Sequence, residues 1–326
     1  MPVKNAGLFL EECLDSILNQ SIDNWELIAI DDNSSDNSVH ILTRYASNDH
    51  RIKTITNTSS GIITALRLAY ANANGTYITR MDADDIMLPQ KLELLLEPLS
   101  INGPRSLSVG LVQYFSETTL GEGYRSYANW LNELTSHSMN FDSIYKECTI
   151  PSPAWMLHRE DLDRCGAFDS NVYPEDYDLA FRMRADNLKV YPTKEIVHLW
   201  RDHPTRSSRT HDNYKDNTFL PLKVNHFLRS DHDTSKHLVL WGAGTKGKKI
   251  AKLLKAQNIS FKWITNNTKK IGKEIYQKIL EPDDSIETQV NNQLIIAIAH
   301  PEEQQEIKRR LAVENKEDFK NSFFFC

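Results

Sequence analysis

Cysteine is scarce in this chain, and the positions it occupies exclude several kinds of site. The 326 residues include four cysteines, Cys13, Cys148, Cys165 and Cys326, which are scattered without the spacing of a metal-binding or redox pair. A disulfide-rich secreted domain is therefore not expected. We predict four reduced thiols in a cytoplasmic protein, with Cys13 packed inside a helix.

The sequence also lacks a long apolar run and an excess of positive charge. No stretch is long enough to cross a bilayer, and no signal peptide is recognised. The net charge of -6 gives no electrostatic reason for nonspecific binding to nucleic acid or to an anionic membrane. With 40% hydrophobic and 25% charged residues, the composition is that of an ordinary globular protein. We predict a cytoplasmic location and leave peripheral contact with the inner membrane face open.

The first two thirds of the chain alternate between amphipathic and short apolar segments. Apolar residues recur at helical spacing from Gly7 to Asn19, and a short apolar strand is predicted over 25–30. Strands that alternate with helices predict an α/β fold with a mostly parallel sheet covered on both faces. In such sheets ligands bind beyond the carboxyl ends of the strands.

An acidic stretch, residues 82–85, follows a strand that is predicted to begin near Tyr77. Side chains two positions apart on an extended chain point the same way, so Asp82 and Asp84 should converge. Two converging carboxylates suit a hard divalent cation such as Mn²⁺ or Mg²⁺. A turn or a helix cap uses the same residue types, and these residues alone do not decide between the two interpretations.

Two further acidic groups stand at the boundaries of predicted elements. Asp31 and Asp32 follow the strand over 25–30, so they should line the same crevice as the first group. An acidic side chain near the start of a helix is stabilised by the positive end of the helix dipole. This effect is sufficient to explain one acid there, but not obviously three. Three stand at the start of a predicted buried helix: Glu175, Asp176 and Asp178.

A polar, basic loop is predicted over 197–209. It contains two histidines and three arginines: His198, His203, Arg201, Arg206 and Arg209. Beside a crevice lined by carboxylates, such a loop is typical of the positive half of a diphosphate site. A solvated loop would have the same composition, and His198 could instead be a metal ligand.

Several motifs now stand in one order along the chain, at residues 2–5, 14–20, 31–36, 81–85 and 175–178. Together they resemble the family 2 glycosyltransferases, over about residues 1–210. The resemblance implies the GT-A fold, a mixed sheet with helices on both faces. It also implies inverting transfer of a sugar from a nucleotide-sugar, most often a UDP-sugar, to a hydroxyl of a glycan, a lipid-linked or another acceptor.

The resemblance implies roles for individual residues as well. Asp31 or Asp32 would bind the donor's base, and Asp176 would be the general base. The donor-binding set is Pro2, Val3, Asp31, Asp32, Asp82, Arg201, Arg206 and Arg209, with His203 beside the arginines. The metal ion, Mn²⁺ or Mg²⁺, would be held by Asp84 and Asp82, with His198 as a further candidate.

The sequence departs from the family at its start. The family has an apolar strand immediately before the position of Pro2 and Val3, and here the chain begins there. That strand belongs in the middle of the sheet, so its absence would leave backbone donors and acceptors unpaired. We expect either a natural start several residues upstream or a poorly folding product.

A second, smaller domain is predicted after residue 228, with a polar linker over 229–236 and the domain itself over 237–326. Gly242, Gly244 and Gly247 follow a strand and open a helix, the context of a dinucleotide-binding fingerprint. The acid expected after the second strand is replaced by Asn266 and Asn267, so no firm NAD site is predicted. The segment is similar to the small Rossmann-like module of sugar acyltransferases. Residues 270–273 add to this resemblance.

Two other functions remain open beside the transferase. An NAD(P)-dependent oxidoreductase centred on the second domain would leave the first two thirds of the chain unexplained. A non-catalytic nucleotide-sugar sensor would have no need for a base such as Asp176. The acidic balance argues against a nucleic-acid partner. The sugar, the acceptor and the oligomeric state are not encoded in any recognisable pattern.

Overall fold

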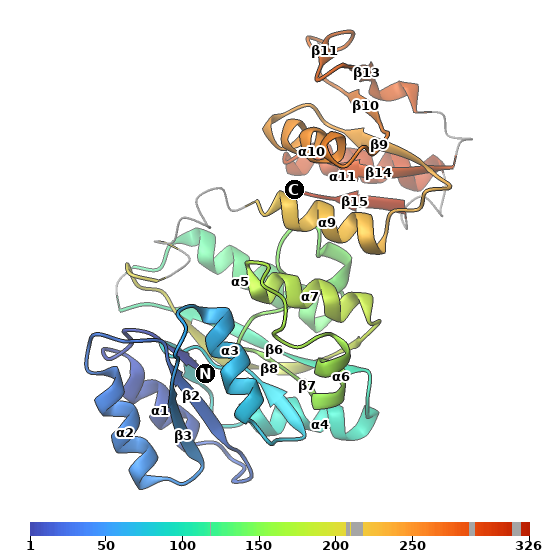
Figure 1. The fold of residues 1–326 in the computed structure, drawn as a ribbon. Coiled ribbons are helices and arrows are strands. Elements are labelled where there is room, and N and C mark those ends of the chain that lie inside the picture. Colours follow the sequence, from blue (N-terminus) through green and yellow to red (C-terminus); the bar gives the residue numbers. More distant parts are fainter. Residues whose placement is uncertain (118, 207–208, 210–217, 287–290, 315–320) are drawn as a thin grey trace. The chain divides into compact units, whose positions relative to one another are not determined.

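The computed structural model describes residues 1–117, 119–206, 209, 218–286, 291–314 and 321–326 (Figure 1). Contacts divide the chain into two compact units. The N-terminal unit contains residues 1–142 and 148–215, and the C-terminal unit contains residues 143–147 and 216–326. The domain boundary predicted at residue 228 stays a prediction, although helix α9 (Leu220–Ser230) belongs entirely to the C-terminal unit.

The N-terminal unit alternates strands and helices. Its helices are α1 (Leu10–Leu18), α2 (Ser38–Asn48), α3 (Ile62–Asn72), α4 (Lys91–Asn102), α5 (Glu122–Ser136), α6 (Arg159–Arg164) and α7 (Glu175–Ala185), with a 3-10 turn η1 (Asn140–Ser143) at its border. Its strands are β1 (Pro2–Val3), β2 (Leu27–Asp31), β3 (Ile52–Thr56), β4 (Tyr77–Thr79), β5 (Ile86–Met87), β6 (Ser106–Phe115), β7 (Trp155–His158) and β8 (Lys189–Arg201).

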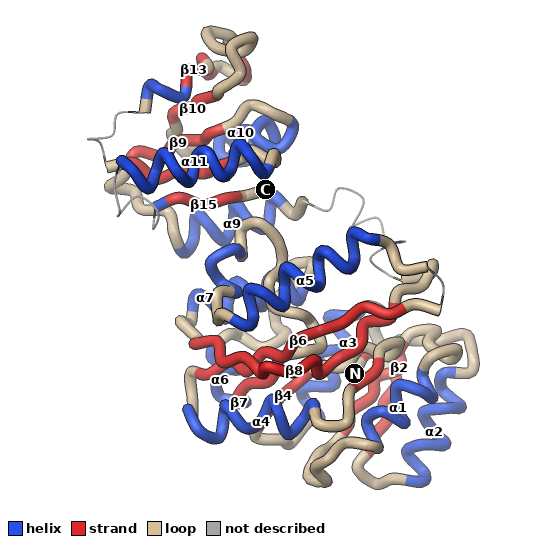
Figure 2. Tube along the Cα trace, turned by 180° about the vertical axis from the view of Figure 1, so that it is seen from behind, coloured by secondary structure: helices blue, strands red, loops and turns tan. Residues whose placement is uncertain are grey.

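These strands form two sheets. A parallel sheet has the order β1-β2-β3, and a mixed sheet has the order β4-β7-β6-β8-β5. Helices α4 and α5 cover opposite faces of the mixed sheet around its neighbouring strands β6 and β8 (Figure 2). The mixed α/β fold predicted from the sequence is confirmed.

Strand β2 is apolar from Leu27 to Ile30 because it is covered on both faces. Leu27 and Ala29 pack into the cluster formed with helices α1 and α2. Ile28 and Ile30 point the other way and pack against helix α3. Alternate side chains of a strand point to opposite faces, so two covered faces require a continuous apolar run.

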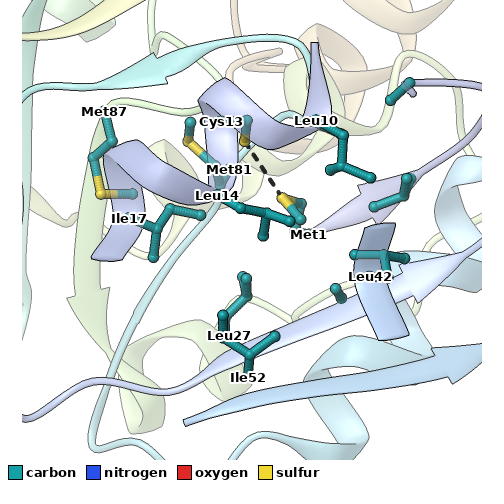
Figure 3. Close-up of a cluster of buried hydrophobic side chains, with 14 of the residues drawn as sticks. Met1, Leu10, Cys13, Leu14, Ile17, Leu27, Leu42, Ile52, Met81 and Met87 are labelled. Atoms are coloured by element: carbon teal, nitrogen blue, oxygen red, sulfur yellow. Dashed lines mark hydrogen bonds between the residues drawn. The ribbon is translucent and has the colours of Figure 1, made fainter. Parts of the chain in front are cut away.

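A cluster of buried apolar side chains in the N-terminal unit surrounds helix α1 (Figure 3). Cys13 is fully buried there, with its sulfur 3.8 Å from the sulfur of Met1. Its predicted position inside a helix is confirmed, and all four cysteines are free thiols.

Strand β8 corrects the prediction of a loop that begins at residue 197. The strand runs on to Arg201 because Ile196 to Arg201 pair with β6. His198 and Leu199 also pair with β5 on the other side. The full strand is not predicted, because its side chains are largely polar and lack the apolar pattern of a strand. Backbone pairing on both edges forms it without that pattern.

The C-terminal unit has a five-stranded parallel sheet in the order β13-β10-β9-β14-β15, so its strands run 3-2-1-4-5 in chain sequence. This is the order of a Rossmann-like fold. Its strands are β9 (His237–Trp241), β10 (Lys262–Thr265), β13 (Glu281–Pro282), β14 (Asn292–Ile296) and β15 (Ser322–Phe324), with a hairpin of β11 (Glu274–Ile275) and β12 (Lys278–Ile279). Its other helices are α10 (Thr245–Ala256), η3 (Asp283–Ser285) and α11 (Pro301–Glu314).

A short segment from the middle of the chain, residues 143–147, belongs to the C-terminal unit. Tyr145 is 4% exposed, and its ring stacks on Phe325 at 4.9 Å between centroids. The ring also forms T-shaped, edge-to-face contacts with Phe227 and Phe323. Among the residues that the structure describes, no helix is both long and apolar enough to span a membrane.

Glycine is required at two positions of the turn after β9, because other backbone atoms lie close to them. Gly242 has a φ of +117°, and a Cβ there would lie 2.8 Å from the carbonyl oxygen of Ala297. A Cβ at Gly247 would lie 2.1 Å from the carbonyl oxygen of Gly242. A Cβ at Gly244 would meet no atom within 4 Å.

We therefore expect Gly247→Ala to lower the free energy of unfolding by about 2 to 3 kcal/mol, because its methyl group has to displace backbone. Gly244→Ala is the matched control and should cost less than about 1 kcal/mol, the ordinary preference for glycine over alanine at a helix N-cap. Urea denaturation of the full chain measures both. Equal losses in the two variants would contradict the packing account.

Candidate functional site

Four predicted donor-site residues meet where β1 and β2 end. Val3 pairs with Asp31 in the parallel sheet, and the amide of Asp32 donates to the carbonyl of Val3 at 2.7 Å. The side chain of Val3 is fully buried in the core, so only its backbone can face a ligand. The carboxylate of Asp32 accepts from Lys4 Nζ at 3.1 Å and from the amide of Gly61 at 3.0 Å.

The acidic stretch 82–85 lies in a turn rather than at the end of a strand. Strand β4 ends at Thr79, and the amide of Asp85 contacts the carbonyl of Asp82 across the turn at 3.4 Å. The alternation argument for Asp82 and Asp84 is therefore wrong, because it requires extended backbone. The turn sends the two carboxylates to different partners.

Asp82 is paired with Arg80, a residue the sequence analysis missed. The guanidinium of Arg80 lies 3.1 Å from a carboxylate oxygen of Asp82 and 2.8 Å from one of Glu175. Arg80 is only 7% exposed, so these contacts are poorly screened by solvent. One buried cation thus joins the acidic turn to the acidic start of helix α7.

Asp176 lies beside this link at the start of helix α7. Its burial and the charge of Glu175 raise the pKa of Asp176 to about 7, although the Arg80 charge acts in the opposite direction. One of its oxygens accepts from the amide of Tyr177 at 2.8 Å. A carboxyl group with a pKa near 7 can take up and release a proton under physiological conditions.

Asp84 is paired with His203, whose ring nitrogen Nε2 lies 3.0 Å from Asp84 Oδ2. Burial works to raise the pKa of Asp84, but the hydrogen bond from His203 and the charge of Arg206 outweigh it and lower that pKa. The Asp84 side chain keeps 28% of its surface exposed. It is therefore an ionised carboxylate that a ligand can reach.

These residues fit a divalent cation in part. Asp84 and His203 bring a carboxylate oxygen and an imidazole nitrogen together, both of which are metal ligands in proteins. Asp82 is engaged by Arg80. In the described part of the chain no group of three or more His, Cys, Asp or Glu side chains is placed to hold a metal ion.

His198 does not face this group, which corrects its predicted place as a metal ligand. Its side chain is fully buried, with Nδ1 3.0 Å from Lys91 Nζ and Nε2 2.9 Å from Asp85 Oδ2. Burial and the charges of Lys91 and Arg206 lower the pKa of His198 well below its usual value, so the ring is neutral. A neutral ring has one donor and one acceptor nitrogen, and here both have partners.

The buried contacts of His198 with Lys91 and Asp85 also hold the acidic turn in place. Burial lowers the pKa of Lys91 to about 7, and burial together with Asp84 and Asp82 raises that of Asp85 well above its usual value. The other Asp85 oxygen accepts from the backbone amide of Arg201 at 2.8 Å. Asp85 therefore ties the turn to strand β8.

Arg201 anchors the turn as well, instead of facing an open diphosphate site as predicted. Its Nε donates to the carbonyl of Asp84 at 2.8 Å, and its guanidinium pairs with the carboxylates of Glu12 and Glu117. Only 3% of its side chain is exposed. The two carboxylates therefore balance its charge, and the carbonyl of Asp84 accepts from its Nε.

The other two arginines lie over aromatic rings. Arg206 lies over Tyr114 and Trp200, 5.3 and 5.8 Å from their centroids, within electrostatic reach of the acidic turn. Arg209 forms two parallel hydrogen bonds with Asp202, at 2.8 and 2.7 Å. Of these two arginines, Arg206 is the one whose charge acts on Asp84 and Asp85.

Comparison with known proteins now assigns the chain to a family. Residues 1–166, half of the chain, match the family described as Glycosyl transferase family 2. The chain belongs to glycosyltransferase family 2. The family resemblance drawn from the motifs is confirmed.

Curated relatives support the assignment. An uncharacterized glycosyltransferase of Haemophilus influenzae is 32% identical over 229 residues, which cover 67% of this chain and 69% of that protein. Glycosyltransferase GlyA of Streptococcus pneumoniae is 31% identical over 209 residues, which cover 60% of this chain and 28% of that protein. In three of the relatives the match spans between 28% and 38% of their length.

Solved structures support the GT-A fold. TarS 1–349 of S. aureus in complex with UDP has a TM-score of 0.51 at 14% identity, over 78% of this chain and 69% of that chain. Mannosyltransferase PcManGT from Pyrobaculum calidifontis, in complex with GDP-Man and Mn²⁺, has a TM-score of 0.51 at 18% identity, over 77% of this glycosyltransferase and 66% of that chain. At these identities the likeness concerns the fold.

The two histidines of the site should differ sharply when they are replaced. His198→Ala leaves Lys91 and Asp85 buried without their common partner, so the free energy of unfolding should fall by about 3 to 5 kcal/mol. His203→Ala removes a partly exposed contact and should cost about 1 kcal/mol. Chemical denaturation measures both values, and a His198→Ala variant as stable as His203→Ala would refute the buried-network account.

Proposed function

We propose that this glycosyltransferase moves a sugar from a nucleotide-sugar, of the UDP type, to a hydroxyl group of an acceptor with inversion at the anomeric carbon. The observation that carries the proposal is the pair of acidic groups joined by Arg80. The acidic turn offers a reachable carboxylate at Asp84, and helix α7 offers a carboxyl group with a pKa near 7 at Asp176. The UDP and GDP-Man complexes of the two structural neighbours support a nucleotide-sugar donor.

The donor would lie along the ends of β1, β2 and β4. The nucleoside would contact Asp31 and the backbone of Pro2 and Val3, because Asp32 accepts from Lys4 and Gly61 at shorter distances than Asp31 accepts from the amide of Ser34. The diphosphate would lie near Arg206, whose charge is within reach of the acidic turn. Arg201 and Arg209 would support the site through the carboxylates and the carbonyl they bind.

A divalent cation, Mn²⁺ or Mg²⁺, would be held by Asp84, with His203 and Asp82 as the neighbouring candidates. When bound, such a cation stabilises the negative charge that develops on a departing nucleoside diphosphate. Asp84 supports this role because its pKa is lowered and its side chain is partly exposed. The Mn²⁺ in the mannosyltransferase complex is consistent with it.

Asp176 would remove the proton from the acceptor hydroxyl. The hydroxyl oxygen forms a bond to the anomeric carbon while the bond from that carbon to the diphosphate oxygen breaks, and the proton passes to a carboxylate oxygen of Asp176. Attack opposite to the leaving group inverts the configuration. Arg80 would hold Glu175 and Asp82 so that the base and the donor carboxylate keep their places.

The first test is release of nucleoside diphosphate from a panel of nucleotide sugars, with and without Mn²⁺. Wild type should release it only with the metal, and Asp84→Ala should lose this release. Asp176→Asn should still bind the donor but transfer about 10² to 10⁴ times more slowly. Asp23→Ala, at a fully exposed carboxylate, is the control. Metal-independent turnover that survives Asp84→Ala would overturn the proposed donor site.

The second test is the pH dependence of transfer. A base acts when it has lost its proton, so the rate should rise with pH and level off above about pH 7, the pKa of Asp176 in the structure. Arg80→Gln removes a charge that lowers this pKa, so the profile should move to higher pH by about one unit. Glu175→Gln removes a charge that raises it and should move the profile the other way. Profiles that move together in the two variants would contradict this account of the base.

A further inference from the structure

One stretch of the C-terminal unit has an unusual charge. Between Asp233 and Glu274 the chain contains ten lysines and no aspartate, glutamate or arginine, although the whole protein carries a net charge of -6. The lysines are Lys236, Lys246, Lys248, Lys249, Lys252, Lys255, Lys262, Lys269, Lys270 and Lys273. The overall negative charge predicted no attraction to anionic surfaces, and that average conceals this local excess.

The fold gathers most of these lysines on one surface. Helix α10 buries Ile250, Ala251 and Leu254 and directs its lysines outward. Lys255 Nζ donates to the backbone carbonyl of Tyr276 at 2.6 Å, and Lys252 Nζ lies 5.1 Å from the centroid of the Tyr276 ring. Through Tyr276, the outer side of α10 therefore continues onto the hairpin β11–β12. We call α10 with residues 269–279 the lysine surface.

The lysine surface is poorly neutralised. In the part of the chain that the structure describes, eight of its lysines form no ion pair with a carboxylate: Lys246, Lys248, Lys252, Lys255, Lys269, Lys270, Lys273 and Lys278. Two carboxylates lie at its edge, Glu274 on β11 and Glu303, which accepts from Asn266 at 2.8 Å. Like charges at helical spacing, such as Lys248 and Lys252, repel one another. Folding alone does not account for this arrangement.

An exposed apolar side chain stands at the edge of the lysine surface. Ile279 on β12 is 63% exposed, which is unusual for isoleucine. Its neighbour Lys278 donates to the carbonyl of Phe261 at 3.0 Å, which fixes the strand against the body of the unit. Lysines around an exposed aliphatic residue are the combination by which proteins bind the surface of an anionic bilayer.

The residue types favour a lipid surface over a nucleic acid. The surface contains no arginine, the side chain that binds single phosphates with two parallel hydrogen bonds. Its one aromatic ring, Tyr276, stacks on Trp263 and lies under Lys252, so it is not free to stack on a base. Lysines instead match a diffuse field of negative charge.

We propose that the lysine surface binds an anionic lipid bilayer, with lysines of α10 at the headgroups and Ile279 inserted between them. This binding is independent of the transferase chemistry. It would bring the enzyme to hydroxyl acceptors that are themselves held in a membrane.

The test is co-sedimentation of the full chain with phosphatidylcholine vesicles, with and without phosphatidylglycerol. We expect binding only with phosphatidylglycerol and loss of binding at high salt. Lys248→Glu combined with Lys252→Glu should weaken it by about tenfold or more, since each lysine contributes near an anionic surface. Ile279→Ser should weaken it less and leave the salt dependence unchanged.

The matched control is Lys189→Glu combined with Lys194→Glu, two exposed lysines of the N-terminal unit that give the same change in net charge. An equal loss in the control would overturn the proposal, because net charge would then explain the binding. Equal binding to neutral vesicles, or binding to RNA without binding to anionic vesicles, would also overturn it. No donor is present in this assay, so its outcome is separate from that of the proposed transfer reaction.

Discussion

The site depends on the buried contacts of Arg80. An arginine that is almost fully enclosed needs carboxylate partners, and those it finds come from segments nearly a hundred residues apart, at Asp82 and Glu175. The acidic turn and the start of helix α7 are thereby held by one cation. The buried chain of Lys91, His198 and Asp85 supports the same turn from the opposite side. The acidic turn is fixed by side chains that are not themselves exposed to a ligand.

The sequence was sufficient for the elements whose surroundings impose a simple pattern. Strand β2 is apolar because both of its faces are covered, and helix α1 shows a buried stripe because one of its faces is covered. The family motifs identified the acidic groups as a set. The roles carried over to individual donor-site residues stay predictions, since no ligand contact is described for them.

The errors arose where tertiary contacts override local pattern. Local pattern predicts extended chain at 82–85, where the structure has a turn, and a loop from residue 197 onward, where strand β8 continues. Local pattern offers His198 as a metal ligand. Its burial between Lys91 and Asp85 cannot be predicted from local pattern, because these contacts join residues about a hundred positions apart in the sequence. Arg80 gave a signal that could have been used: a lone cation two residues before an acidic cluster needs a partner.

The excursion of residues 143–147 into the C-terminal unit has a consequence for how such proteins can diverge. The chain enters that unit at 143, leaves it at 147 and returns at 216. A single genetic crossover between the units would separate Tyr145 from the aromatic residues that enclose it. A lineage that exchanges its C-terminal unit and keeps these contacts therefore has to alter a segment between β6 and β7 at the same time.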